Sequence, residues 1–217
     1  MQTQAVIFDL DGLLVDTEPL HWRVFNAMLA RRGVAYEIQD EEFGREFVGI
    51  SQRENSEYLI ARFGIRASAD ELTREHRVEY ERIIADPKNL MLMPGARDVF
   101  DELRRRGVRM AIASGSPRTQ VETILRGLGI SALFRAIVTG SDVANLKPAP
   151  DVYLRACAEL RVDAACCLAL EDSAVGAAAA KAAGLRVIVV PNRYTRHQGL
   201  ALADARVESL AQAVGLL

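Results

Sequence analysis

The stretch Ala5-Val6-Ile7-Phe8-Asp9-Leu10-Asp11-Gly12 decides how this chain of 217 residues is expected to fold. Its first four residues are apolar and two are β-branched, which is typical of a short buried strand. Because side chains alternate along a strand, Asp9 and Asp11 are expected to point the same way. Two such carboxylates repel each other unless a cation lies beside them, and Mg²⁺ commonly binds one or two carboxylates. Gly12 permits a tight turn that leaves backbone amides free to face a ligand. The stretch therefore predicts a metal-assisted site at the carboxyl end of a strand.

Two other interpretations of Asp9–Gly12 are open at this point. The acids could be a solvated strand end, or they could belong to a calcium-binding EF-hand loop. An EF-hand requires glycine at loop position six, glutamate at position twelve and a preceding helix. Gly12 is only the fourth residue counted from Asp9, and the preceding run is not helical. Features further along the chain favour the metal-assisted site.

A second apolar run, Met110–Ala113, predicts a buried strand that ends at Ser114 and Gly115. Ser116 suits the N-cap of a following helix, and Pro117 suits its first residue. Ser114 and Gly115 would then precede a helix N-terminus, where free amides and the helix dipole favour anions. An ordinary turn is the alternative.

Two further pieces follow in order. Lys147 stands beside Pro148 in a segment that cannot be regular helix or central strand, so a stiff loop is expected to hold its ammonium group. The apolar run Cys167–Leu170 then ends in Glu171 and Asp172. A solvated lysine and a pair of acids complementing a helix dipole are the alternatives.

Taken together and in this order, these pieces resemble the haloacid dehalogenase superfamily, in particular its phosphatase and phosphomutase branch. The segment from Asp9 to His21 is similar to the subgroup that contains β-phosphoglucomutase and sugar-phosphate phosphatases. The resemblance covers essentially the whole chain. It is specific for the superfamily and much less so for the substrate.

The resemblance implies catalytic roles at five positions. Asp9 would be the nucleophile that forms an aspartyl-phosphate, and Asp11 would be the general acid and then the general base. Ser114, with the amide of Gly115, would hold a phosphoryl oxygen. Lys147 would neutralise charge between Asp9 and the phosphoryl group.

The resemblance also implies a cofactor and further substrate contacts. Mg²⁺ would be held by Asp9, the carbonyl of Asp11, Asp172 and Glu171. The other substrate-binding or phosphate-binding candidates are Gly12, Thr17, His21, Gly49 and Arg53. A solvent-facing position in the first helix is the alternative for His21.

The order of patterns predicts an α/β fold. Strand-like runs at 5–9, 109–113, 135–139, 166–170 and 185–190, the later ones separated by helical patterns, indicate a Rossmann-like, doubly wound parallel sheet. Residues 17–90 contain no convincing strand and about four helical patterns. We expect an inserted α-helical cap at 17–90 and a core domain formed by 1–16 and 91–217. Ligands of such sheets bind at the carboxyl ends of the strands, where the acids, serine and lysine are expected.

The cap bears on the choice between hydrolysis and phosphoryl migration. A β-phosphoglucomutase pattern has lysine just before Gly49 and arginine three residues after it, where this chain has Val48 and Gln52. A mutase must grip a second phosphate, a task suited to arginine or lysine, and Arg53 would compensate only in part. Thr17 and His21 do match the mutase pattern. We therefore expect a phosphatase acting on a small phosphorylated metabolite such as a sugar phosphate, with a phosphomutase as the alternative.

Two other classes use a reactive aspartate. A 2-haloacid dehalogenase needs no metal and lacks the second acid, whereas this chain has Asp11 followed by Gly12. A receiver-type signalling domain is shorter, lacks a cap and carries its phosphorylated aspartate on a middle strand. Both fit this sequence less well.

Charge and composition limit the partners. A formal net charge of −2 gives no reason to expect binding to nucleic acid or membrane. The three cysteines have no metal-site spacing and are typical of a reducing compartment, and the N-terminal apolar run is too short for a secretion signal. We expect a cytoplasmic protein, and no feature requires more than a monomer.

Overall fold

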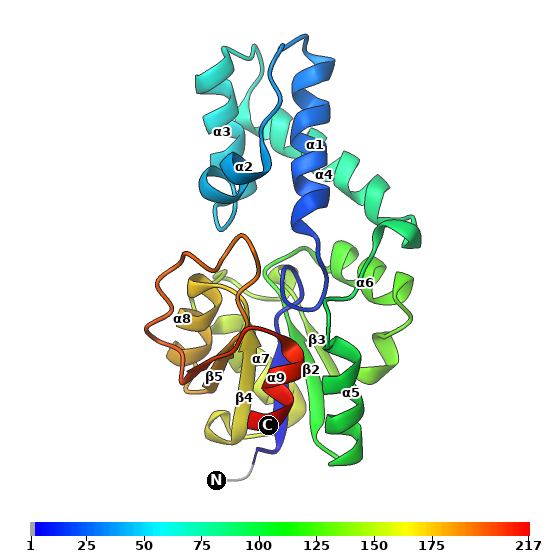
Figure 1. Ribbon diagram of the computed structural model, residues 1–217, viewed down its shortest axis with the longest axis vertical. Coiled ribbons are helices and arrows are strands. Elements are labelled where there is room, and N and C mark those ends of the chain that lie inside the picture. The colour runs from blue at the N-terminus through cyan, green and yellow to red at the C-terminus, as the bar shows by residue number, and fades with distance from the viewer. Residues whose placement is uncertain (1–2) are drawn as a thin grey trace.

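The computed structural model describes residues 3–217 and builds them around a six-stranded parallel sheet in the order β3-β2-β1-β4-β5-β6 (Figure 1). The strands are β1 (Ala5–Phe8), β2 (Arg109–Ala113), β3 (Ala136–Val138), β4 (Cys167–Glu171), β5 (Arg186–Val189) and β6 (Ala205–Arg206). Five of them coincide with the apolar runs of the sequence. The two-residue β6, one residue of which is exposed, was not expected.

Helices cover both faces of the sheet. They are α5 (Ala96–Arg105), α6 (Arg118–Gly127), α7 (Asp151–Leu160), α8 (Ala174–Ala182) and α9 (Leu210–Ala213). Val6 and Phe8 belong to the core on the side of α5, α6 and α9, whereas Ala5 and Ile7 belong to the core on the side of α7 and α8. This alternation is the period of two expected for a strand buried on both faces. It confirms the predicted α/β, doubly wound fold.

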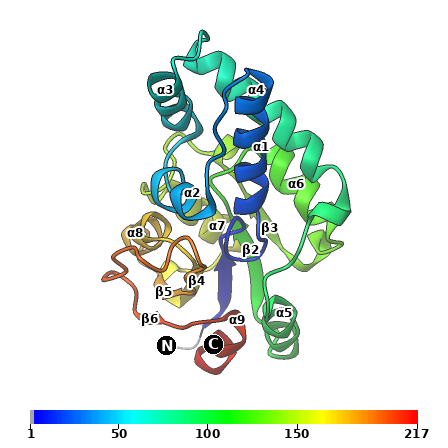
Figure 2. The ribbon, with the colours of Figure 1, turned by 45° about the horizontal axis from the view of Figure 1, so that its top comes forward.

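The cap segment, residues 17–90, contains four α-helices in the described chain. They are α1 (Glu18–Arg31), α2 (Asp40–Glu46), α3 (Gln52–Phe63) and α4 (Ala69–Ile84). Figures 1 and 2 show these helices gathered at one end of the sheet, away from α5 and α9. Short 3₁₀ turns complete the described chain at Pro87–Asn89, Ser131–Leu133, Gly140–Asp142, Ala164–Cys166 and Val214–Leu216.

The cap segment joins the sheet through two connections that run side by side. The amide of Met93 donates to the carbonyl of Leu14 at 2.8 Å, and the amide of Asp16 donates to that of Met91 at 3.2 Å. Both contacts fall where the sequence predicts the boundaries of the cap. The division into two domains stays a prediction.

Strand register brings the candidate residues to one edge of the sheet. Phe8 pairs with Ile112 of β2 on one side and with Leu170 of β4 on the other, so these three strands end within one residue of one another. Asp9 follows directly, and its amide donates to the carbonyl of Leu170 at 3.0 Å. β1 is also the strand at which the sheet order reverses. In open α/β sheets, such switch points form the crevice where ligands bind.

Candidate active site

Three carboxylates and one ammonium group meet at the carboxyl end of β1 and β4. Lys147 Nζ lies 2.6 Å from Asp9 Oδ1 and 2.6 Å from Glu171 Oε1. Asp9, Glu171 and Asp172 each offer one oxygen, and these oxygens all lie within 4.8 Å of one another. All three residues are buried, Glu171 most completely at 1% exposed. The structure thus brings together residues that lie up to 163 positions apart in the sequence.

Burial governs the electrostatics of this cluster. It raises the pKa of Asp9 to about 7; Glu171 and Asp11 add to the rise, and Lys147 opposes it. Burial, Asp9 and Glu171 also raise the pKa of Asp172 well above its ordinary range. Burial alone would lower the pKa of Lys147, but its attraction to Asp9 and Glu171 outweighs burial and raises that pKa. One lysine therefore offsets the repulsion among these carboxylates only in part.

Asp11 lies beside this cluster and is held by two serines. Its Oδ2 accepts hydrogen bonds from Ser116 Oγ at 2.7 Å and Ser114 Oγ at 3.3 Å. Among residues 3–217, its buried Oδ1 has no hydrogen-bond partner. The sequence-based assignment of Ser116 as a helix N-cap is wrong: α6 begins at Arg118 and its N-cap is Pro117. Ser116 instead points back to Asp11.

The turn after Asp11 needs glycine for two reasons. Gly12 has a φ of +80°, and a Cβ at this position would lie 2.7 Å from both Asn192 Nδ2 and Asp172 Oδ2. Ordinary residues adopt this φ only at a cost, and they would collide with both side chains. The loop 9–12 and the carboxylate of Asp172 are therefore packed directly against each other.

Tyr153 of α7 holds Glu171 in place. Its hydroxyl donates to Glu171 Oε1 at 2.5 Å and lies 3.4 Å from Lys147 Nζ. The other oxygen of Glu171 accepts from the amide of Asp172 at 3.2 Å. A side chain at Gly176 of α8 would collide with this carboxylate. Glu171 is thus fixed in place by donors of the chain itself.

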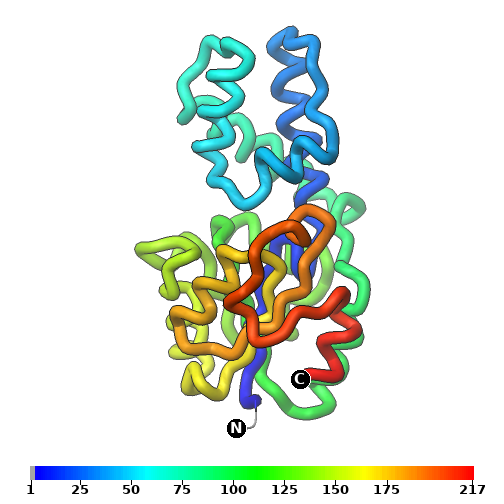
Figure 3. Tube along the Cα trace, turned by 60° about the vertical axis from the view of Figure 1, so that its left-hand side comes forward, coloured from blue at the N-terminus to red at the C-terminus, as the bar shows by residue number. Residues whose placement is uncertain are grey.

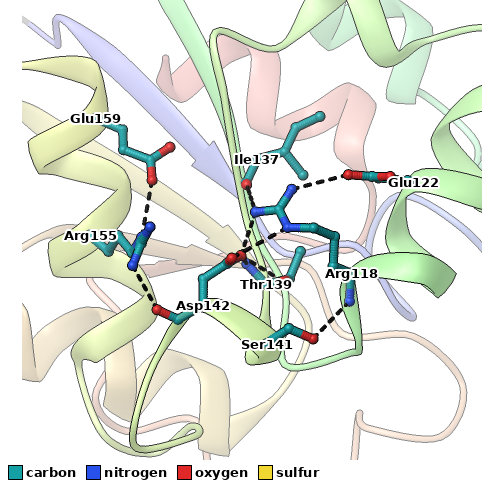
Figure 4. A network of polar contacts seen from close by, with 8 residues as sticks. All are labelled: Arg118, Glu122, Ile137, Thr139, Ser141, Asp142, Arg155 and Glu159. Carbon is teal, nitrogen blue, oxygen red and sulfur yellow. Dashed lines mark hydrogen bonds and ion pairs between the residues drawn. The ribbon is translucent and has the colours of Figure 1, made fainter.

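The two loops that carry Ser114 and Lys147 are joined by the network drawn in Figure 4. Arg118 Nη2 donates to Asp142 Oδ2 at 2.5 Å, and the same oxygen accepts from the amide of Thr139 at 2.9 Å. The amide of Gly140 donates to the carbonyl of Ser116 at 3.0 Å. A side chain at Gly140 would strike the carbonyl of Gly115. The turn after β2 and the turn after β3 therefore pack as one unit.

Two candidates of the cap segment line the start of α1. Thr17 is fully buried, and no residue in the described part of the chain pairs with its hydroxyl. The His21 ring stacks on Tyr80 with the centroids 4.0 Å apart, and its Nδ1 lies 3.3 Å from His76 Nε2. Burial lowers the pKa of His21 to about 4. His21 therefore faces other side chains rather than open solvent.

The two candidates between α2 and α3 are placed differently. Gly49 has a φ of +83°, and a Cβ there would lie 3.5 Å from Gln198 of the loop after β5. The Arg53 guanidinium pairs with Asp70, and with Glu57 at 3.1 Å, on the exposed surface of the cap segment. The structure does not bring Arg53 to the acidic cluster. A substrate contact by Arg53 stays a prediction.

The donor set fits a hard divalent cation. Oxygen ligands from two or three carboxylates that lie close enough to share one ion suit Mg²⁺. Glu171 stays a candidate ligand, although both of its oxygens already accept hydrogen bonds.

Sequence reasoning missed three residues that shape the site: Ser116, Tyr153 and Asn192. Asn192 follows β5 by three residues, and polar residues just after a parallel strand reach the ligand edge of a sheet. Tyr153 lies six residues after Lys147, in the first turn of the next helix. The sequence positions of Asn192 and Tyr153 therefore indicate that they reach the site. The sequence around Ser116 fits a helix cap as well as it fits a hydrogen bond to Asp11.

Comparisons with known proteins agree with this geometry. A family model described as haloacid dehalogenase-like hydrolase matches residues 3–184. The protein CbbY of Rhodobacter capsulatus is 35% identical, over 98% of this chain and 96% of its own length. Hexitol phosphatase B of Escherichia coli is 33% identical, over 97% of this chain and 94% of its own.

Two solved structures extend the comparison to the fold. CbbY of Rhodobacter sphaeroides, as a variant in complex with xylulose-(1,5)bisphosphate, superposes with a TM-score of 0.83 at 34% identity, covering 97% of this chain and 96% of its own. A β-phosphoglucomutase-like protein of Thermotoga maritima gives a TM-score of 0.81 at 29% identity, covering 100% and 98%. In residues 3–217, no helix is both long and apolar enough to cross a membrane.

Proposed function

This chain belongs to the haloacid dehalogenase-like hydrolase family as a phosphatase, and we propose that it hydrolyses a small phosphorylated sugar with the help of Mg²⁺ through an aspartyl-phosphate on Asp9. The observation that carries the proposal is the convergence of Asp9, Asp172 and Lys147 beside Asp11. Phosphoryl transfer depends on in-line positioning and on neutralising oxygen charge, and this cluster supplies both.

The first step transfers the phosphoryl group to Asp9. A carboxylate oxygen of Asp9 attacks phosphorus while the bond from phosphorus to the sugar oxygen breaks. Asp11 gives its proton to the departing alkoxide, and its Oδ1 is the oxygen left unpaired by the described residues. Lys147, Ser114 and the amide of Gly115 offset the charge of the phosphoryl oxygens.

The second step releases phosphate. Asp11, now ionised, takes a proton from water, whose oxygen attacks the phosphorus of the aspartyl-phosphate. The bond from phosphorus to Asp9 breaks, and both carboxyl groups return to their starting states. The hydroxyl of Ser116 keeps Asp11 in place throughout.

Asp9, Asp172 and the carbonyl of Asp11 would hold Mg²⁺, with Glu171 as a further candidate. When bound, the cation withdraws charge from the phosphoryl oxygens and lets the anionic nucleophile approach an anionic ester. Lys147 alone cannot do so, because Asp9 and Glu171 already share its ammonium group.

Two kinds of observation support a sugar phosphate as the substrate. A hexitol phosphatase and a protein crystallised with a xylulose bisphosphate are each about one-third identical to this chain over nearly its full length. The helices of the cap segment stand over the carboxyl edge of the sheet, where they would enclose a small ligand and exclude water (Figure 1).

The direct test is phosphate release from a panel of phosphorylated sugars and sugar alcohols, with Mg²⁺ and with excess EDTA. We expect release from one or a few members, abolished by EDTA and by the Asp9→Asn substitution. β-Glucose 1-phosphate with a trace of the 1,6-bisphosphate is assayed for glucose 6-phosphate in parallel. Isomerisation with little free phosphate would replace the phosphatase by a phosphomutase, which the pairing of Arg53 with Asp70 and Glu57 disfavours.

A further inference from the structure

Asn192, in the loop after β5, has every polar atom of its side chain hydrogen-bonded, and its amide nitrogen reaches the metal site. Its Nδ2 donates to Asp172 Oδ2 at 2.8 Å and to the carbonyl of Gly12 at 3.1 Å. Its Oδ1 accepts from the amides of Tyr194 at 2.8 Å and Thr195 at 3.2 Å. The residue is 9% exposed. These four bonds fix both the rotamer and the orientation of the amide group.

We propose that Asn192 is a positioning residue that sets the orientation of Asp172 and the Gly12 turn for cation binding, and that Tyr194 links this positioning to the cap segment. The proposal rests on the Mg²⁺ site of the proposed function and not on the identity of the substrate.

The first half of the proposal follows from the direction of the bonds at Asp172. Asn192 Nδ2 engages Oδ2, which leaves Oδ1 of Asp172 without a hydrogen bond from Asn192. The same amide nitrogen holds the carbonyl of Gly12, next to the residue whose carbonyl would bind the cation. One donor group therefore fixes two parts of the site that are 160 residues apart. Partners that orient metal ligands in this way commonly contribute ten- to a hundredfold to metal affinity.

The second half follows from what lies two residues further on. The Tyr194 hydroxyl donates to Asp40 Oδ1 of α2 at 2.6 Å, and its ring meets Phe43 edge to face at 5.6 Å. A side chain at Gly44 would strike the Tyr194 ring. In Figure 3 the loop that carries Tyr194, in orange, rises toward the base of the cap segment.

A cavity of about 430 Å³ lies at this junction, lined by residues of α2 and of the loop, including Gly44, Arg45, Tyr194 and His197. The junction is therefore not closely packed. The hydrogen bond from Tyr194 to Asp40 and the ring contact with Phe43 do much to hold the loop against α2. The amide of Tyr194 also donates to Asn192. A shift of α2 would therefore move Tyr194, and through Asn192 it would change the orientation of Asp172.

The test is the affinity for Mg²⁺ alone, measured by isothermal titration calorimetry without substrate. Asn192→Leu keeps the approximate size and removes both donors, so we expect Mg²⁺ affinity to fall by about tenfold or more. Asn26→Leu is the matched control, since the side-chain amide of Asn26 also makes two hydrogen bonds, both to the backbone of Ile38 in the cap segment. Its Mg²⁺ affinity should equal that of the wild type. Asn192→Gln, which keeps an amide, serves if the leucine variant does not fold.

The link to the cap segment is tested by a double-mutant cycle. Tyr194→Phe keeps the ring and loses the bond to Asp40, and we expect it to weaken Mg²⁺ binding about two- to threefold. In the Asn192→Leu background, the same change should have no effect on affinity. Additive effects would contradict the link between Tyr194 and Asn192.

Two results would overturn the positioning role: wild-type Mg²⁺ affinity in the Asn192 variant that folds, or an equal loss in Asn26→Leu. Failure of the proposed function looks different. If no sugar phosphate is hydrolysed but Asn192→Leu still binds Mg²⁺ more weakly than the control, the substrate proposal fails and the positioning role stands.

Discussion

The carboxylate of Asp11 has two unlike oxygens. Oδ2 accepts from Ser114 and Ser116, while Oδ1 is buried and unpaired among the residues that the structure describes. A group held by one oxygen and free at the other suits proton transfer to a bound ester oxygen. Asp11→Asn keeps the shape but cannot give and take the proton. We expect kcat to fall by about 10²- to 10⁴-fold, measured as Mg²⁺-dependent phosphate release.

The exposed Asp101 of α5 provides a control of the same chemistry, and Asp101→Asn should keep the wild-type rate. A wild-type kcat in Asp11→Asn would contradict the acid and base role.

The site residues that were predicted from sequence are marked by the residues next to them, whereas the missed residues matter through contacts with distant parts of the chain. Asp9, Asp11, Lys147 and the Glu171–Asp172 pair carry charge at strand ends or in a stiff loop, which is visible locally. Asn192 matters because it meets Gly12, 180 positions away. The position of Asn192 just after β5 indicates that it reaches the ligand edge of the sheet, but its contact with Gly12 depends on strand order and loop path, which the residues around Asn192 do not give.

At the scale of elements, the turns after β2 and β3 act as one support for the phosphate end of the site. Arg118 joins them through Asp142, a bond between side chains that are 38% and 15% exposed (Figure 4). Arg118→Met should lower the free energy of unfolding by about 1 kcal/mol, as partly exposed ion pairs do. It should also raise KM, because the Ser114 turn loses a tether. Urea unfolding and steady-state kinetics measure the two effects.

Arg105→Met removes an exposed pair with Glu102 on α5, far from these turns. It should leave KM unchanged. An equal KM in Arg118→Met and the wild type would show that the two turns hold their arrangement without Arg118.

Elements were predictable where the pattern was long or strongly apolar. The five longer strands and the helices α1, α3 and α4 have that property, and they appear where expected, whereas the short and mostly charged α2 does not have it. β6 has only two residues and an exposed arginine, so it forms only because β5 offers a free edge. The start of α6 was misplaced because a hydroxyl before proline can either cap the helix or turn to a distant acid, as Ser116 does.

At the scale of the whole molecule, the cap segment contains a buried pair of histidines whose charging opposes folding. Burial lowers the pKa of His76 to about 3, and nearby His21 adds to the effect. An unfolded histidine titrates near 6.5. Below that pH the unfolded chain takes up a proton that the folded chain refuses, so stability is complete above about 6.5 and declines as the pH falls.

His76→Phe removes this proton uptake while keeping a ring beside Phe25 and Tyr80. From pH 7.5 to pH 5, the unfolding free energy of the variant should improve relative to the wild type by about 2 kcal/mol. Urea unfolding at a series of pH values measures this difference. A difference that does not change with pH would mean that His76 has the same pKa in the folded and the unfolded chain, which would contradict the effect of burial.

The central claim is that Asp9 carries the phosphoryl group, and the most direct measurement is rapid acid quench of a single turnover followed by peptide mass spectrometry. With a sugar phosphate that the panel identifies and with Mg²⁺, we predict a phosphoryl group on the peptide containing Asp9 that forms before free phosphate appears and then decays. If phosphate is released at full rate while that peptide stays unmodified at every time point, water attacks the substrate directly and the account of Asp9 as nucleophile is wrong.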